Sequence, residues 1–195
     1  MYFDKFIGID WSGDKNRFQK GISVAECIRG NNVPQIIKPY NNKYWTRSTL
    51  IEWLYKEIKS QKNLIGFDFA FSYPFYDKCC YFPGIKDSPI NSEKLWKLIE
   101  DTNRNVKNFY GGDIWANKTY GKFFNSPKHK GSQFSSRRRY TESLAKKILS
   151  PSPTFNCVGP GSVGTGTLAG MRILNLLKNK TKIWPFDEFN FSTKS

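Results

Sequence analysis

An almost uninterrupted apolar run at residues 64–71, broken by one carboxylate at Asp68, constrains the fold of this chain more than any other feature. A run of this kind is typical of a central strand that is covered on both faces of a sheet. Three strand-like segments and one amphipathic helix precede it, at residues 6–11, 21–28, 33–40 and 47–60. This order predicts an α/β domain.

The remainder of the chain divides into a basic segment and a glycine-rich segment. We expect a helix near residues 92–103, and we interpret residues 72–150 as an insertion or lid on a single domain that spans residues 1–195. The predicted elements after it are a strand at 154–158, a glycine loop at 159–167, a helix to about residue 178 and a strand at 182–186.

The charge balance of the chain restricts its partners. Lys and Arg number 31 against 16 Asp and Glu, which gives a net charge of +15. Such an excess favours a polyanionic partner, most often nucleic acid and less often a membrane surface. No apolar run approaches the roughly 20 residues of a membrane span, and the first residues do not resemble a signal peptide. We therefore expect a cytoplasmic protein without a membrane partner.

The cysteines and the single histidine exclude several kinds of site. The four cysteines, at positions 27, 79, 80 and 157, form no C-x-x-C pair and have no zinc-type spacing, so we interpret them as reduced thiols. His129 is the sole histidine, which excludes a cluster of histidine ligands.

Residues 104–147 concentrate the positive charge, with eleven Lys and Arg against two acids. The most common interpretation of such a segment is a solvated loop. Here, however, aromatic side chains alternate with the cations, and exposed aromatics beside lysine and arginine can stack bases and hold phosphates. The aromatic residues concerned are Phe109, Tyr110, Trp115, Tyr120, Phe123, Phe124, Phe134 and Tyr140. We therefore expect this segment to contact nucleic acid.

Two carboxylates, Asp10 and Asp68, are embedded in apolar strands. A charge in such a setting is costly unless it is paired, hydrogen-bonded or bound to a cation. If the first and fourth strands are parallel neighbours, both acids emerge at the same end of the sheet and could hold Mg²⁺ or Mn²⁺. The alternative is that the two aspartates cap loops or pair with basic residues.

The glycine loop has two open interpretations. Gly159, Gly161 and Gly164 formally satisfy G-x-G-x-x-G between a strand and a helix, and Asp187 follows 23 residues after Gly164. Too little chain follows for a dinucleotide fold, and a Walker lysine is missing. Backbone N–H groups of the loop, together with the side chains of Ser162 and Thr165, would suit a phosphate. The glycines would equally permit close packing of helix on sheet.

A run of three arginines, Arg137, Arg138 and Arg139, precedes a short predicted helix that Thr141 would cap. Arginine binds phosphate through two parallel hydrogen bonds, so these residues are candidate phosphate ligands. Glu142 is a candidate metal ligand, although an acid in the first helical turn more commonly balances the helix dipole.

Several blocks of the sequence resemble a known group of proteins. FIGIDWSG at residues 6–13 and GFDFAFSYP at 66–74 resemble the first and fourth strands of RNase H-like proteins, and more closely an uncharacterised bacterial family of predicted nucleases. The blocks at 139–142, 161–166 and 184–187 resemble further segments of that family. The resemblance implies a mixed RNase H-like sheet flanked by helices, with divalent metal bound by the acids that correspond to Asp10 and Asp68.

The resemblance also implies a third acid, since the superfamily usually supplies one from a later helix. Glu142 and Asp187 are the candidates in this sequence. We therefore predict a nuclease that hydrolyses DNA or RNA with Mg²⁺ or Mn²⁺. The rival hypotheses are a non-catalytic nucleic-acid-binding module of the same fold and, less favoured, a nucleotide-binding protein.

Overall fold

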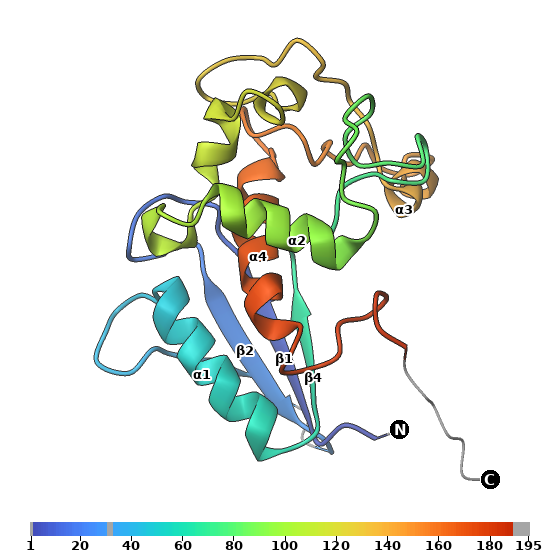
Figure 1. Cartoon of the computed structure of the whole chain (residues 1–195). Coiled ribbons are helices and arrows are strands. Elements are labelled where there is room, and N and C mark those ends of the chain that lie inside the picture. The colour runs from blue at the N-terminus through green and yellow to red at the C-terminus, as the bar shows by residue number, and fades with distance from the viewer. Residues whose placement is uncertain (1, 31–32, 189–195) are drawn as a thin grey trace, which may run out of the picture.

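A four-stranded mixed sheet forms the base of the molecule (Figure 1). The computed structural model describes residues 2–30 and 33–188. The strands are β1 (Lys5–Asp10), β2 (Ser23–Ile28), β3 (Gln35–Ile37) and β4 (Asn63–Phe67). Their order in the sheet is β3-β2-β1-β4. β1 runs antiparallel to β2 and parallel to β4, as an α/β chain with an initial meander requires.

Helix α1 (Arg47–Ser60) makes the crossover that joins β3 to β4. A connection between parallel strands has to cross the sheet, and a helix is the usual way to do so. The helix begins with a reciprocal cap, because Oγ1 of Thr46 accepts the N–H of Thr49 at 3.0 Å and Oγ1 of Thr49 accepts the N–H of Thr46 at 3.1 Å. Its buried face includes Leu50 and Leu54, which belong to the same core as the inward side chains of the sheet.

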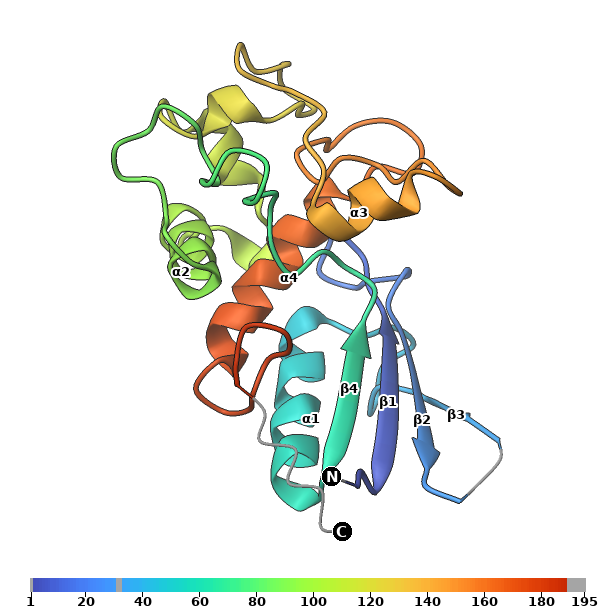
Figure 2. The ribbon, with the colours of Figure 1, turned by 90° about the vertical axis from the view of Figure 1, so that its right-hand side faces the viewer.

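The sheet has one covered and one open face. Along β1, Ile7 and Ile9 are buried, whereas Phe6 and Gly8 are exposed. Figure 2 shows α1 and α4 on the same side of the strands and, in the part of the chain that is described, no helix on the other side. The prediction that residues 64–71 form a central strand covered on both faces is therefore wrong, because β4 ends at Phe67 and lies at the edge of the sheet.

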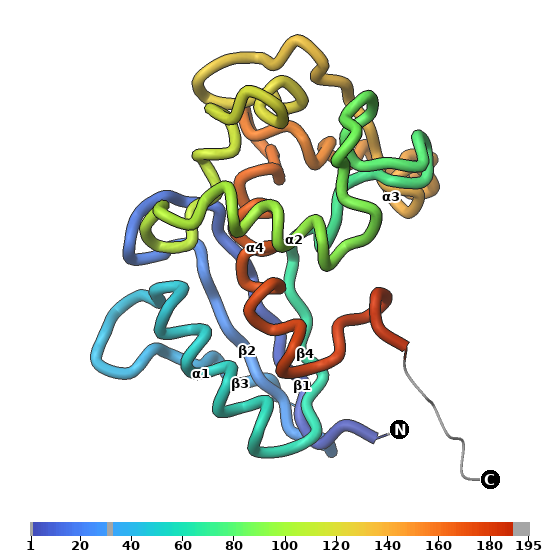
Figure 3. The backbone as a smooth tube through the Cα atoms, viewed as in Figure 1, coloured from blue at the N-terminus to red at the C-terminus, as the bar shows by residue number. Residues whose placement is uncertain are grey.

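Two helices that pack against each other connect the sheet to the segment that follows β4. They are α2 (Ser92–Thr102) and α4 (Gly164–Leu177), and the buried guanidinium of Arg172 on α4 binds Glu100 on α2 at 2.6 Å. The tube in Figure 3 follows the chain from β4 into the insertion and back to α4. Because α4 contacts both parts, the insertion is joined to the sheet by a shared core.

Aromatic side chains from the insertion pack around Phe155 within the shared core. The rings of Tyr73 and Phe155 stack with centroids 4.3 Å apart, and Phe82 and Phe124 pack edge-on against them. The shorter elements around this cluster are η1 (Lys107–Phe109), η2 (Gly112–Ala116), η3 (Gly121–Phe123) and α3 (Tyr140–Ala145). Cations and aromatics alternate in this segment mainly because the aromatics fill this interior while the cations stay in water.

Several predicted elements need correction. Residues 154–158 form no strand but a single bridge between Asn156 and Asn125, and residues 182–186 form no strand but end in a turn at 184–186. α4 begins at Gly164, inside the predicted glycine loop. α3 ends at Ala145 and begins after Arg139, so Thr141 does not cap it. In the described ranges, no helix is both long and apolar enough to cross a bilayer.

Candidate active site

The structure brings Asp10 and Asp68 together at the end of two neighbouring strands. Asp10 is the last residue of β1, and Asp68 directly follows β4. The parallel register pairs Ile9 with Phe67, and the N–H of Asp68 donates to the carbonyl of Ile9 at 3.2 Å. Both carboxylates are exposed, and the alternation along each strand places them on the face opposite α1.

The two carboxyl groups interact electrostatically. Partial burial raises the pKa of Asp68, a hydrogen bond from the N–H of Trp11 opposes this, and the adjacent negative charge of Asp10 raises the pKa further. The Trp11 N–H lies 2.9 Å from Oδ1 of Asp68. Two acids that repel each other in this way form a site that a cation would stabilise.

The carboxylate pair fits part of a divalent metal site. Mg²⁺ prefers oxygen ligands and is commonly held by one or two carboxylates, with water and substrate phosphate completing its shell. Within residues 2–30 and 33–188, no group of three or more His, Cys, Asp or Glu side chains is arranged to hold a metal ion. Asp10 and Asp68 would therefore bind such an ion together with ligands from water or substrate.

The two candidate third acids are engaged elsewhere. Glu142 bonds the guanidinium of Arg139 at 2.8 Å and accepts the N–H of the same residue, so it stabilises the first turn of α3. Asp187 accepts the N–H of Ile183 at 2.6 Å and closes a turn. The structure does not bring either of them to the Asp10–Asp68 pair.

The loop after Asp10 lies directly against the first turn of α4. The indole N–H of Trp11 donates to the carbonyl of Gly166 at 3.1 Å. A Cβ on Gly13 would lie 2.4 Å from the backbone nitrogen of Gly166, so only glycine permits this approach. The start of α4 is thereby fixed close to the carboxylate pair.

The glycine loop itself serves turns and packing. Gly159 and Gly161 have φ angles of +85° and +70°, which favour glycine. A Cβ on Gly164 would lie 2.5 Å from the carbonyl oxygen of Asn156. Ser162 donates its N–H to Gly159 within the loop, and Thr165 lies in the first turn of α4. Packing thus accounts for Gly164, while phosphate binding by the loop stays a prediction.

The three arginines are largely occupied within the protein. The guanidinium of Arg137 binds both carboxylate oxygens of Asp77 at 2.7–2.8 Å and three backbone carbonyls. Arg138 donates to the carbonyls of Pro151 and Ser136. Arg139 pairs with Glu142. Their main observed role is therefore to fix the segment that leads into α3.

One residue that was not predicted from the sequence holds the loop after Asp10 in place. Arg47 is 1% exposed and donates to the carbonyls of Asn108 at 2.7 Å and Asp14 at 2.9 Å, as well as to that of Ser12. Burial lowers its pKa to about 10. Because it holds the loop that follows Asp10, Arg47 is a positioning residue. An arginine at the start of a helix gives no sequence signal for this role.

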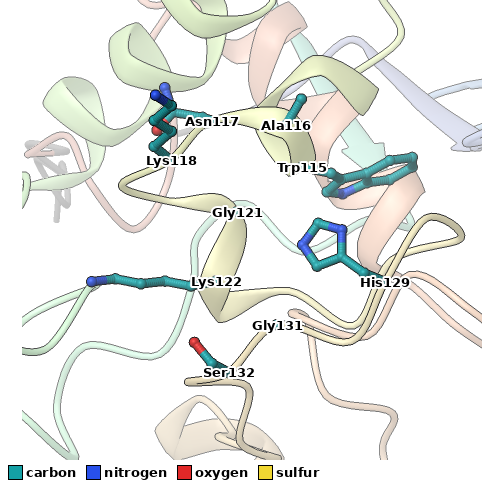
Figure 4. A pocket seen from close by; sticks show the side chains of 9 residues that line it. All are labelled: Trp115, Ala116, Asn117, Lys118, Gly121, Lys122, His129, Gly131 and Ser132. Carbon is teal, nitrogen blue, oxygen red and sulfur yellow. The ribbon is translucent and has the colours of Figure 1, made fainter.

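The hollows of the insertion do not contain the carboxylate pair. One hollow of about 420 Å³ is bordered by residues of η2, η3 and the following loop, with His129 facing Trp115 (Figure 4). A second hollow, of about 430 Å³, lies beside Lys78 and Arg137. Asp10 and Asp68 line neither of these two hollows, and both carboxylates are exposed at the ends of their strands.

Comparison of the chain with protein-family models, with curated proteins and with solved structures gave no match.

Proposed function

We propose that this protein is a divalent-metal-dependent nuclease on an RNase H-like fold. The observation that carries the proposal is the meeting of Asp10 and Asp68 at the ends of two parallel strands. The mixed sheet supports the proposal, since the sequence resemblance implies a mixed sheet and β1 is antiparallel to β2 and parallel to β4.

The chemistry follows from the ligands. Asp10 and Asp68 would hold Mg²⁺ or Mn²⁺, which when bound orients a phosphodiester and lowers the pKa of water. Asp68 accepts the Trp11 N–H through Oδ1, so this bond orients the carboxylate. Arg47 and the start of α4 hold the loop after Asp10 in place. The chain thereby presents two exposed carboxylates, of which Asp68 is oriented by the Trp11 N–H.

The overall charge supports a nucleic acid as substrate. A net charge of +15 attracts a polyanion over the whole molecule. The carboxylate pair is then a local negative site on a positive molecule, which suits a cation that bridges the protein and a phosphate.

A cleavage panel tests the proposal. Labelled single-stranded, duplex, hybrid and branched oligonucleotides are incubated with Mg²⁺ or Mn²⁺ and the wild type, Asp10→Asn or Asp68→Asn. The matched control is Asp113→Asn, because Asp113 is an exposed acid on η2. We expect cleavage by the wild type and the control, and at least a hundredfold loss in both site variants. Retained cleavage in the site variants would reject the mechanism.

A non-catalytic nucleic-acid-binding module is the second candidate. It is favoured by one observation, namely that the described residues supply the pair with no third acid. It predicts binding that weakens steeply with salt and no hydrolysis with any metal. The same panel, with retention measured beside cleavage, separates the two functions.

A further inference from the structure

Two tyrosines that are distant in sequence meet on the surface beside α3. Tyr76 is 78% exposed and Tyr140, the first residue of α3, is 59% exposed. Their ring centroids lie 5.5 Å apart with an interplanar angle of 57°. Exposed tyrosine rings are common at binding surfaces, and here two of them contact each other.

The pair is held in place from both sides. Asp77, directly after Tyr76, binds the guanidinium of Arg137 through both carboxylate oxygens. Arg137 also donates to the carbonyls of Pro74, Cys80 and Tyr81, which brackets the Tyr76 loop. On the other side, the Arg139–Glu142 ion pair fixes the first turn of α3. The two rings are therefore preorganised by a network that spans 60 residues of sequence.

Tyr140 differs in exposure from the other aromatics of the basic segment. Among the eight that the sequence suggested as a stacking surface, it is the exposed one, and the other seven are buried or half-buried. Tyr76, from outside that segment, supplies its partner. The structure thus reduces a diffuse aromatic pattern to one specific pair.

Exposed cations flank the pair along the chain: Lys78 follows Tyr76 by two residues, and Lys146 and Lys147 directly follow α3. The neighbouring acids are paired, because Asp77 binds Arg137 and Glu142 binds Arg139. Both views of the ribbon place α3 beyond the end of β4 that leads to Asp68 (Figures 1 and 2). Aromatic rings beside cations are the usual means of holding unpaired bases and their phosphates.

We infer that Tyr76 and Tyr140 form a base-stacking platform for single-stranded nucleic acid, on the part of the molecule that lies beyond the carboxyl end of β4. This inference rests on the proposed function for the class of ligand and adds to it a preference for unpaired bases. A duplex hides the faces of its bases, so it gains nothing from the platform. Leu144 and Ile148 are exposed on the same segment, so an acidic protein segment is the rival occupant.

Fluorescence anisotropy with labelled 20-nucleotide thymidine and uridine strands tests the platform, beside a duplex of equal length. All proteins carry Asp10→Asn, and EDTA is present, so that cleavage plays no part. We expect Tyr76→Ala and Tyr140→Ala each to weaken single-strand binding about tenfold, in line with the loss of one stacked base, with little change for the duplex. Tyr76→Phe keeps the ring and should bind as the parent does.

The control is Tyr40→Ala, because Tyr40 is 88% exposed on the far loop before α1. Unchanged single-strand affinity in both platform variants, with unchanged melting temperatures, would overturn the inference and assign the surface to a protein partner. An equal loss on single strand and duplex would also overturn it. The cleavage panel separates this inference from the proposed function. Tyrosine-dependent binding without cleavage by the wild type would refute the nuclease and leave the platform standing. Cleavage by the wild type, with single-strand affinity unchanged in the tyrosine variants, would support the nuclease and refute the platform.

Discussion

The backbone N–H of Trp11 donates a 2.9 Å hydrogen bond to Oδ1 of Asp68, which ties the end of β1 to the end of β4 across 57 residues of sequence. The same carboxylate is repelled by Asp10. Asp68 therefore has two opposite effects on the stability of the metal-free protein, and two substitutions separate them.

Asp68→Ala removes both effects, whereas Asp68→Asn keeps Oδ1 as acceptor and removes only the charge. We expect Asp68→Ala to lower the melting temperature by at most about 2–4 °C, since the loss of a hydrogen bond of about 1 kcal/mol is partly offset by the loss of the repulsion from Asp10. Asp68→Asn should melt at or above the wild-type temperature. Thermal denaturation in EDTA measures this, and an Asn variant as unstable as the Ala variant would contradict the assignment.

Replacement of Arg47 should strongly destabilise the fold. Arg47→Met would leave the carbonyls of Ser12, Asp14 and Asn108 without their donor in a buried place. The expected loss is about 2–4 kcal/mol in the free energy of unfolding, measured in urea. Arg104→Met is the control, because the Arg104 side chain is 70% exposed and its ion pair with Asp101 contributes little. A similar small effect in both variants would refute the positioning role.

Gly170 on α4 should not tolerate a methyl group. A Cβ there would lie 2.3 Å from Cδ2 of the Phe69 ring, so Gly170→Ala should cost about 1–3 kcal/mol even though alanine favours helix. Gly8→Ala is the matched control, since nothing lies within 4 Å of a Cβ at Gly8 on the open face of the sheet. Urea unfolding of both variants measures the difference, and a stabilised Gly170→Ala would show that α4 does not pack as described.

The Arg137–Asp77 pair should make stability depend on pH in acid. Its hydrogen bonds lower the pKa of Asp77 below the ordinary value of 3.8. The stabilisation is therefore complete above the unfolded-state pKa near 4 and is lost as the pH falls through the lower folded-state pKa. Asp77→Asn should melt below the wild type at pH 7 and approach it below about pH 3. A melting-temperature difference that stays constant from pH 7 to pH 2 would contradict this.

The cysteines should differ sharply in reactivity. Burial raises the pKa of Cys157 to about 12, so its thiol stays protonated at pH 8, whereas Cys79 is exposed. Iodoacetamide at pH 8 should label Cys79 and leave Cys157 unmodified until the protein is unfolded. Peptide mass spectrometry before and after addition of guanidinium measures this, and rapid labelling of Cys157 in the folded protein would contradict its burial.

The first half of the chain was the more predictable from sequence. The order of β1, β2, β3, α1 and β4 could be predicted because each element carries its own periodicity and ends at clear turn residues. The meeting of Asp10 and Asp68 followed from the parallel pairing of their strands. The open face of the sheet could not be predicted, because an apolar edge strand and an apolar central strand have the same sequence pattern.

The insertion resisted prediction for a different reason. Its folding depends on contacts between distant residues, such as Tyr73 with Phe155 and Arg137 with Asp77, and no local pattern encodes these. The arginine run suggested phosphate binding, but bonds to Asp77 and to backbone carbonyls occupy Arg137. The segment predicted as a strand at 154–158 pairs at a single bridge, and the glycine turns at Gly159 and Gly161 follow it before α4 begins.

The most direct test of the account is a Mn²⁺ titration followed by electron paramagnetic resonance, with the wild type, Asp10→Asn and the control Asp113→Asn. The hexaaqua ion gives a strong signal that disappears on binding, so the measurement needs no substrate. We predict that the wild type and Asp113→Asn bind one ion with equal affinity, and that Asp10→Asn binds it at least tenfold more weakly. Equal Mn²⁺ affinity in all three proteins would contradict the claim that Asp10 and Asp68 form a cation site.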